Sequence, residues 1–373
     1  MNSFAPDSIV SADFFEIPEV ISSTIQLDKN EQPEDVSDEM KRRVLNKLFH
    51  TEWNRYPAAD YSEIESKIAH YSGLQPDNIV LGAGSANIIS AMLNYFAINK
   101  KRIHIVQPSY TLFDQHCKNY GIAYEPWYLN EELEFDYKNM PELDKNSVLI
   151  ITSPNNPVGN SIETYKLEEI LMMHPYTMVI LDNVYNEFCN SDFTSLVKKY
   201  NNLIVLRSFS KAFPAAGLRL GYLCAPRHIK PILKSLILPY SINEFSLIFA
   251  REILFDKKFM ESSKRKVEEM IHNRNKLIDS ITRRFDKDTI RVYPSSGNFL
   301  LLRVINESDF TKLMTDLEKG GMKVLNGSHF PLLKNTLRVS IGNMEHNELF
   351  LRCLVNCMEN NFIKNQNIEA TFD

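Results

Sequence analysis

The sequence lacks any apolar run close to the roughly 18 consecutive residues that a membrane-spanning helix needs. It also lacks an excess of positive charge, because 42 lysines and arginines stand against 47 aspartates and glutamates, for a net charge of −5. Residues 1–6 show no basic region leading into an apolar stretch, as a signal peptide would. We therefore expect a cytoplasmic protein that binds neither nucleic acid nor a membrane.

Cysteine is scarce, scattered and odd in number, with five residues among 373. This pattern does not suit a disulfide framework, and reduced thiols in a cytosol fit it best. Cys353 and Cys357 lie four positions apart on a predicted helix and would supply only half of a tetrahedral metal site. Ordinary packing is the simpler account of the pair, so we predict no metal site.

The length of 373 residues is large for one core and suits two domains that share a cleft. Residues 1–35 contain three prolines and little periodicity, which indicates an N-terminal arm laid on another surface. We predict a large domain over residues 36–245 and a small C-terminal domain over residues 246–373.

Short apolar runs alternate with helical patterns through the predicted large domain. Strands are predicted at 79–81, 103–106, 148–152, 178–181 and 203–206, and helices at 36–49, 60–71, 86–97 and 111–120. Such alternation is typical of an α/β fold, a mostly parallel, doubly wound sheet covered on both faces. Helical patterns then dominate 231–285. The last part reads as α+β, with strands at 299–304 and 337–341 around a helix at 309–319.

One lysine stands in an unusual setting just after the predicted strand 203–206. Ser208, Ser210, Lys211 and Arg219 lie within twelve residues of one another. Ligands of open α/β sheets bind at the carboxyl ends of strands. Two hydroxyls and a guanidinium can hold a phosphate there and leave the lysine amine free for covalent work, as Schiff-base chemistry with pyridoxal 5′-phosphate requires. A solvated surface lysine is the plainer alternative for this segment alone.

Other predicted strand ends carry polar groups as well. Gly84 and Ser85 open a helix whose first N–H groups can receive a phosphate, although a tight turn explains the glycines equally. The loop 153–159 contains two prolines and a glycine, and it either holds the Asn156 amide still or is simply a rigid turn. Asp182 ends a predicted buried strand. Burying a carboxylate there costs free energy unless a cation, such as a protonated pyridine nitrogen, pairs with it. Tyr185 is placed to donate to the oxygen of such a ring.

Several motifs in a fixed order, within residues 27–343, together resemble those of fold-type I pyridoxal-phosphate enzymes of the class I/II aminotransferases. Within them, the chain is most similar to the histidinol-phosphate aminotransferase family. The motifs are 27–33 (LDKNEQP), 55–57 (RYP), 84–87 (GSAN), 108–110 (PSY), 155–157 (NNP), 182–185 (DNVY) and 208–211 (SFSK), and 337–339 (LRV) follows them.

The resemblance implies a role for each matching residue. Lys211 would form the Schiff base and move the proton at the substrate Cα, and Asp182 and Tyr185 would act with it. The residues that would bind the cofactor are Ser85, Ala86, Tyr110, Asn156, Asp182, Tyr185, Ser208, Ser210, Lys211 and Arg219, with Tyr56 reaching the phosphate of a neighbouring subunit. Arg338 would clamp a substrate carboxylate or phosphate, with Asn30 beside it. A homodimer with composite sites follows from the role of Tyr56.

One departure from the family pattern concerns the substrate. Histidinol-phosphate enzymes usually carry a second phosphate-binding arginine in the stretch 321–327, and here Leu325 takes its place. Losing one charged hydrogen-bond partner costs about 1.5–3 kcal/mol. Lys323 should point to the same side of a strand as Leu325, so it could compensate in part.

The resemblance thus implies an aminotransferase that moves an amino group from an amino acid or a histidinol phosphate-like donor to a 2-oxo acid such as 2-oxoglutarate. The same scaffold also supports decarboxylation, elimination or cyclisation of an amino acid, because the conformation at Cα decides which bond breaks. A third possibility is a sensor that binds the cofactor without turnover. The absence of a basic winged-helix segment, and the presence of Lys211, Asp182 and Arg338, argue against it.

Overall fold

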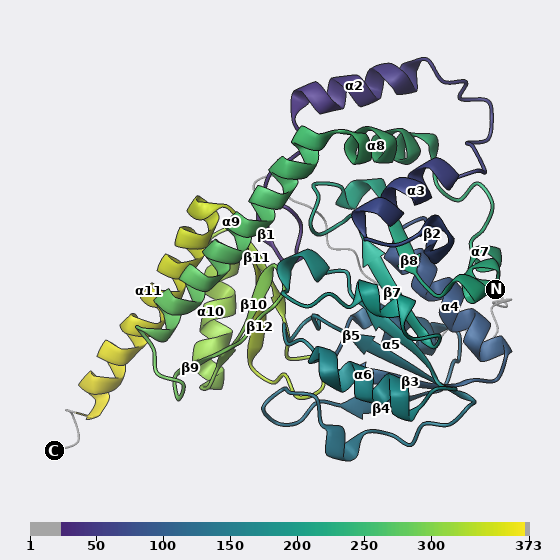
Figure 1. Ribbon diagram of the computed structural model, residues 1–373. Coiled ribbons are helices and arrows are strands. Elements are labelled where there is room, and N and C mark those ends of the chain that lie inside the picture. The colour runs from purple at the N-terminus through teal and green to yellow at the C-terminus, as the bar shows by residue number, and fades with distance from the viewer. Residues whose placement is uncertain (1–23, 370–373) are drawn as a thin grey trace, which may run out of the picture.

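A seven-stranded sheet forms the centre of the larger part of the molecule. The computed structural model describes residues 24–369 (Figure 1). In spatial order the strands are β2 (Ile79–Gly82), β8 (Gly221–Cys224), β7 (Leu203–Ser208), β6 (Met178–Asp182), β5 (Ser147–Thr152), β3 (Arg102–Gln107) and β4 (Tyr124–Tyr128). All neighbours are parallel except β8, which runs antiparallel to both β2 and β7. The predicted mostly parallel α/β sheet is therefore confirmed.

Two strands of this sheet lie outside the predicted pattern, for physical reasons. Strand β4 has Pro126 at its centre, and proline is tolerated there because β4 is an edge strand that pairs only with β3. Strand β8 is four residues long and begins with a glycine, so it carries little periodic signal.

Helices pack on this sheet and against one another. They are α2 (Asp38–Phe49), α3 (Ser62–Tyr71), α4 (Ser85–Ile98), α5 (Thr111–Asn119), α6 (Thr164–Met173), α7 (Lys230–Leu236) and α8 (Glu244–Phe255). Helix α4 contacts β2, β3, β7 and β8, and α8 packs on α2 and α3. Short 3₁₀ turns complete the connections at η1 (Pro76–Asn78), η2 (Tyr137–Asn139), η3 (Asn186–Phe188), η4 (Thr194–Lys198), η5 (Ala216–Leu218) and η6 (Arg227–Ile229).

A second sheet of five strands forms the smaller part. Its order is β1 (Ile25–Leu27), β11 (Met322–Asn326), β12 (Thr336–Ser340), β10 (Phe299–Val304) and β9 (Ile290–Tyr293). Only the β1–β11 pair is parallel. Helices α10 (Glu307–Lys319) and α11 (Met344–Glu369) pack on each other beside it, and the long α9 (Lys257–Thr282) runs from α8 to this sheet (Figure 1).

These contacts bear on the predicted domain limits. Strand β1 lies within the predicted arm 1–35 and is an edge strand of the smaller sheet, while residues 1–23 lie outside the described residues. The boundary near residue 245 stays a prediction. The packing of α8 on α2 and α3 favours a division at Asp256, between α8 and α9.

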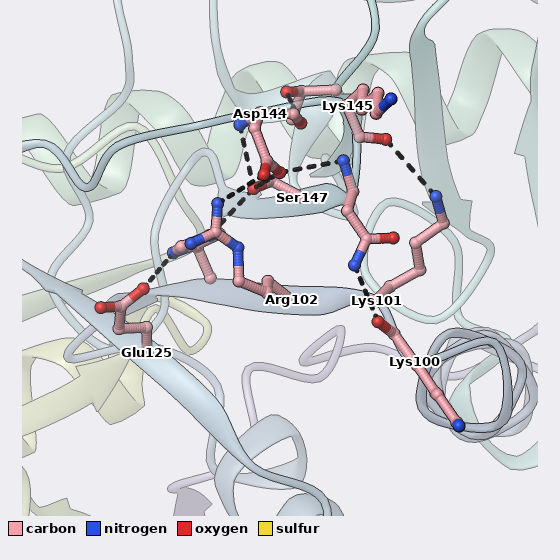
Figure 2. Close-up of polar contacts among 10 residues, drawn as sticks. Lys100, Lys101, Arg102, Glu125, Asp144, Lys145 and Ser147 are labelled. Carbon is pink, nitrogen blue, oxygen red and sulfur yellow. Dashed lines mark hydrogen bonds and ion pairs between the residues drawn. The ribbon is translucent and has the colours of Figure 1, made fainter.

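Polar side chains tie the amino ends of β3 and β5 together, at the edge of the sheet opposite the carboxyl ends (Figure 2). Arg102 forms an ion pair with Asp144 at 2.8 Å, and the Ser147 hydroxyl donates to the same carboxylate at 2.9 Å. Hydrogen bonds from Ser147 and Arg102 lower the pKa of Asp144 to about 2. This cluster satisfies its own charges and supports the fold.

His104 of β3 is fully buried beside this cluster. Its Nδ1 lies 3.1 Å from a carboxylate oxygen of Glu125, and its Nε2 lies 3.4 Å from the hydroxyl of Ser147. Burial lowers its pKa below the ordinary value of 6.5, although Glu125 opposes the shift. The folded protein therefore holds this imidazole neutral.

No helix within residues 24–369 is both long and apolar enough to cross a membrane. The same residues contain no cluster of three or more His, Cys, Asp or Glu side chains placed to hold a metal ion. All five cysteines are free thiols.

We predict that His104 makes the protein less stable in mild acid. Between its lowered pKa and 6.5, the unfolded chain binds the proton and the folded protein does not, so the free energy of unfolding falls as the pH drops through this range. In His104→Gln this loss between about pH 7.5 and about pH 5.5 should shrink. Chemical denaturation at the two pH values measures it, with exposed His70→Gln as the control. An unchanged pH dependence in His104→Gln would contradict the assignment.

Candidate active site

A cleft of about 710 Å³ lies where the carboxyl ends of the central strands face the smaller sheet. Twelve of the thirteen predicted site residues line it, from five separate stretches at the strand ends of the large sheet, from the segment after β1 and from β12. They are Asn30, Ser85, Ala86, Tyr110, Asn156, Asp182, Tyr185, Ser208, Ser210, Lys211, Arg219 and Arg338. Tyr56 is the exception. The structure thus brings these residues together, while their individual roles stay predictions.

Lys211 lies three residues beyond the end of β7, with its side chain in the cleft. Its Nζ donates to the carbonyl oxygen of Lys29 at 2.8 Å, and its own carbonyl oxygen accepts from Gln32 at 2.9 Å. Burial, and then the nearby Arg338 guanidinium, lower the pKa of Lys211 to about 8. An amine with such a pKa loses its proton easily near neutral pH and can act as a nucleophile or base.

Asp182 is the last residue of β6 and only 2% exposed. Its Oδ1 is buried and has no hydrogen-bond partner among the described residues. Burial raises its pKa to about 7, against the opposing effects of the Val184 backbone N–H and of Lys211. A buried carboxylate oxygen without a partner is costly, so this one is suited to a cationic N–H donor from a bound molecule.

The first turn of α4 also lines the cleft. Its N-cap, Gly84, has a φ of 83° and carries no side chain to cap the helix, so the first N–H groups at Ser85 and Ala86 are open to an anion. A Cβ on Gly221 would lie 2.6 Å from the Ser85 nitrogen, which shows how closely β8 approaches this turn. The Arg219 guanidinium lies beside Gly84.

Ser208 and Ser210 line this part of the cleft. The Ser210 backbone N–H donates to the Ser208 hydroxyl oxygen at 3.1 Å, and the Ser208 hydroxyl donates to the Leu220 carbonyl oxygen at 3.4 Å. Open helix N–H groups, two hydroxyls and a guanidinium form a set of donors that suits a phosphate.

Asn30 and Tyr185 are held together above the sheet. The Asn30 amide donates to the Tyr185 hydroxyl oxygen at 2.9 Å, and its Oδ1 accepts from the Ser340 hydroxyl at 2.8 Å. Burial raises the pKa of Tyr185 to about 12, so its hydroxyl keeps its proton and can donate it. Asn30 is 1% exposed and adopts a left-handed φ of 54°. These bonds make it a positioning residue for Tyr185, and its predicted contact with substrate stays a prediction.

Arg338 of β12 brings a buried cation to the cleft from the smaller sheet. Its guanidinium donates to the Asn156 side-chain oxygen and to the Asp28 carbonyl oxygen, and it lies over the Phe299 ring at 5.4 Å from the centroid. Its Nε is buried and has no partner among residues 24–369. Burial lowers its pKa, against Tyr185 and Asp28. A guanidinium whose hydrogen-bonded partners are neutral is suited to an anionic ligand.

Tyr110 and Tyr56, both predicted to bind the cofactor, lie in different environments. Tyr110 is the N-cap of α5, lines the cleft and packs edge-on against Phe113, so the predicted stacking role is geometrically open to it. Tyr56 is 82% exposed and stacks on Tyr240, with ring centroids 4.8 Å apart. The cleft of its own chain does not include Tyr56, which accords with its predicted use by a neighbouring subunit.

Sequence reasoning missed several residues that line the cleft. Helix α5 contributes Thr111, Asp114, Gln115, Lys118 and Asn119, and the loop after β11 contributes His329 and Phe330. A helix after Pro108 was expected, but nothing in its sequence tells which of its turns faces a ligand. His329 and Phe330 reach the cleft only because the smaller sheet docks against the larger part, and no local motif records that docking.

The family model for aminotransferase class I and II matches residues 22–353. The chain belongs to the class I and II aminotransferases. It is 32% identical to the histidinol-phosphate aminotransferase of Pyrococcus furiosus, over 90% of this chain and 93% of the relative. Among solved structures it is similar to the histidinol-phosphate aminotransferase of Clostridium acetobutylicum, with 26% identity, a TM-score of 0.80, and coverage of 90% of this chain and 99% of that one.

A further solved structure shares the fold. The L-threonine-O-3-phosphate decarboxylase of Porphyromonas gingivalis is 22% identical, with a TM-score of 0.73 and coverage of 90% of this chain and 99% of that one. The fold-type I assignment made from the motifs is confirmed, and the protein is a pyridoxal-phosphate-dependent transaminase.

The residues of the cleft fit pyridoxal phosphate. The unpaired Asp182 oxygen suits the pyridine nitrogen, the open turn at Ser85 and Ala86 suits the phosphate, and the Lys211 amine suits the aldehyde. When bound, this cofactor supplies an electron sink for the charge that is left when a bond at the substrate Cα breaks. The predicted role of the Lys211 amine is to take and return the proton at Cα.

We predict that Gly221→Ala weakens cofactor binding by at least tenfold. The new Cβ would lie 2.6 Å from the Ser85 nitrogen and would displace the first turn of α4, where the phosphate N–H donors lie. Gly217→Ala, in the turn η5 just before β8, is the control, because its Cβ would meet nothing within 4 Å. Equilibrium dialysis with pyridoxal phosphate measures the affinity. Equal affinities for the two variants would contradict this account of the phosphate end.

Proposed function

We propose that the protein transfers an amino group from a donor with one anionic end to a 2-oxo acid such as 2-oxoglutarate. The observation that carries this proposal is the placement of the Lys211 amine and the Arg338 guanidinium in one cleft, with Asn156 bonded to Arg338. A donor whose anion lies on Arg338 presents its amino-bearing carbon towards Lys211. The candidate donors are amino acids and amino-alcohol phosphates such as histidinol phosphate, the latter supported by the names of the relatives.

The division of labour follows from the residues already described. Arg338 orients the donor, and Asn156, with its oxygen engaged by Arg338, keeps its amide N–H groups for the cofactor ring oxygen. Tyr185, held by Asn30, donates to the same oxygen. Lys211, with its lowered pKa, carries the proton at the substrate Cα. A cytoplasmic location is part of the proposal, supported by five free cysteines.

The deciding experiment is a half-reaction without any acceptor. Protein loaded with pyridoxal phosphate is mixed with single donors, and the absorption band of the cofactor is followed. We expect it to be converted to the pyridoxamine form and to be restored by 2-oxoglutarate. In Arg338→Gln the donor KM should rise at least tenfold, because the anion loses a charged partner worth about 1.5–3 kcal/mol. Lys211→Ala should abolish the conversion.

The same experiment addresses the alternative reactions. A decarboxylase, a lyase or a cyclase would accumulate product while the cofactor band persists, and 2-oxoglutarate would change nothing. Such a result with several donors would overturn the proposed transamination and leave the cofactor assignment intact.

We propose further that the protein is a homodimer with composite sites. Exposed apolar side chains follow one another on α2 and the segment after it: Leu45 at 55%, Phe49 at 75%, Trp53 at 76% and Tyr56 at 82%. Exposed large apolar groups gathered in one stretch of chain are typical of an interaction surface. Tyr56 on this surface would reach the phosphate in the partner's cleft.

We expect Tyr56→Phe to lower the cofactor affinity by about tenfold, through the loss of one hydrogen bond to a charged phosphate. Tyr240→Phe is the control, since it removes a hydroxyl from the ring on which Tyr56 stacks. Sedimentation should give a dimer for the wild type and for both variants. A monomeric wild type with normal cofactor binding would be incompatible with composite sites.

A further inference from the structure

The side chain directly across from Arg338 is apolar. Strands β11 and β12 are antiparallel, and their register places Leu325 opposite Arg338. Side chains of directly opposed residues project from the same face of a sheet, with Cβ atoms about 4.5–5.5 Å apart. Both residues line the cleft. The group nearest to the anion-binding guanidinium on this strand pair is therefore an aliphatic side chain.

Two aromatic rings extend this apolar wall. His329 and Phe330, in the turn after β11, line the same cleft with ring centroids 4.3 Å apart. Phe330 is 9% exposed. Partial burial of its ring lowers the pKa of His329 below 6.5, against a hydrogen bond with the Asn326 backbone, so the ring is mostly neutral at neutral pH. We call Leu325, His329 and Phe330 together the substrate wall. None of these three side chains is charged at neutral pH.

Lys323 does not replace the missing second cation. It lies two residues before Leu325 on β11, but it is not among the residues that line the cleft. Its Nζ lies 3.7 Å from a carboxylate oxygen of Asp28. The Lys323 ammonium is thus directed to a carboxylate of its own chain. The structure therefore does not show the partial compensation for the missing arginine that the sequence allowed.

The remaining charges near Arg338 do not favour a phosphate dianion on its guanidinium. Glu31 lines the cleft, and so does Asp28, whose Oδ2 faces the Lys323 ammonium while its Oδ1 has no hydrogen-bond partner among the described residues. Lys29 and Lys118 also line it, but both are exposed, and Lys118 forms an ion pair with Asp114 at 2.9 Å. Exposed lysines are solvated and screened, so they add little to the binding of a phosphate.

We infer that the amino donor is an α-amino acid with an uncharged apolar or aromatic side chain, and that Leu325 selects against amino-alcohol phosphates. This inference rests on the transaminase function proposed above. The α-carboxylate, a monoanion, needs only Arg338, and the donor side chain packs against the substrate wall. The donor gives up its amino group and leaves as the 2-oxo acid with the same side chain. The acceptor 2-oxo acid takes the amino group, so no oxidant or reductant is consumed.

The geometry explains why an arginine at position 325 would reverse this choice. Two guanidiniums in directly opposed positions repel each other unless an anion lies between them. A phosphate dianion can accept from both, whereas a carboxylate is already satisfied by the fork of one arginine. Replacing Leu325 therefore exchanges an apolar surface for a second phosphate donor.

The test measures the half-reaction of the loaded enzyme with L-phenylalanine, L-leucine, L-glutamate and L-histidinol phosphate. We expect kcat/KM for L-phenylalanine or L-leucine to exceed that for histidinol phosphate by at least tenfold. In Leu325→Arg the ratio should shift towards histidinol phosphate by about 10- to 100-fold, the effect of one charged hydrogen-bond partner. The matched control Leu325→Met keeps an apolar side chain of similar volume and should keep the wild-type ratio.

A binding measurement provides a readout that does not depend on turnover. Calorimetry of the loaded enzyme should detect 3-phenylpropanoate, a carboxylate with an aromatic side chain, more strongly than inorganic phosphate. Leu325→Arg should reverse the order. If Leu325→Arg fails to fold, Phe330→Ala takes its place and should reduce kcat/KM for L-phenylalanine at least tenfold, with a smaller effect on L-glutamate.

Two failures can be told apart. A wild type that prefers histidinol phosphate, or a folded Leu325→Arg with the wild-type ratio, would overturn the inferred donor class while the transaminase function stands. A cofactor band that no donor converts would instead overturn the proposed function itself.

Discussion

The hydrogen bond from Arg338 to Asn156 is the contact on which the geometry of the cleft depends. Arg338 belongs to the smaller sheet, and Asn156 lies in the loop that follows β5 of the larger sheet. The bond joins a buried guanidinium of the smaller sheet to a residue at the carboxyl ends of the parallel strands. Because the same guanidinium also bonds the backbone of Asp28, three stretches of chain far apart in the sequence meet at one side chain.

Buried ionisable groups are concentrated around this contact. Lys211, Asp182 and Arg338 all have a pKa shifted towards the neutral form, chiefly by burial. Such groups are costly in a protein by itself, because each leaves hydrogen bonds unmade or charge poorly solvated. A cofactor and a substrate that carry the complementary groups recover this cost on binding. The cost of burying these groups thus favours the binding of molecules that carry complementary groups.

The sequence and the structure agree best where chemistry is local. Ser208, Ser210 and Lys211 follow a short buried strand, and Asp182 ends the strand beside it, so the parallel arrangement alone brings them to one edge. The antiparallel β8, the edge strand β4 and the pairing of β1 with β11 were not predicted. Each depends on partners distant in the sequence, and β4 and β8 also contain a proline or a glycine that obscures their periodicity.

The sequence by itself determined the α/β fold, the family and the residues suited to the cofactor, because each of those groups stands close to a strand end or a helix start that its local pattern marks. Only the tertiary structure determined which side chains surround Arg338, where we propose that the substrate binds. The pairing of Leu325 with Arg338, the engagement of Lys323 by Asp28, and the approach of His329 and Phe330 all arise from the way the smaller sheet pairs and docks. Contacts between distant strands are set by register and packing, and a motif in one segment does not contain that information.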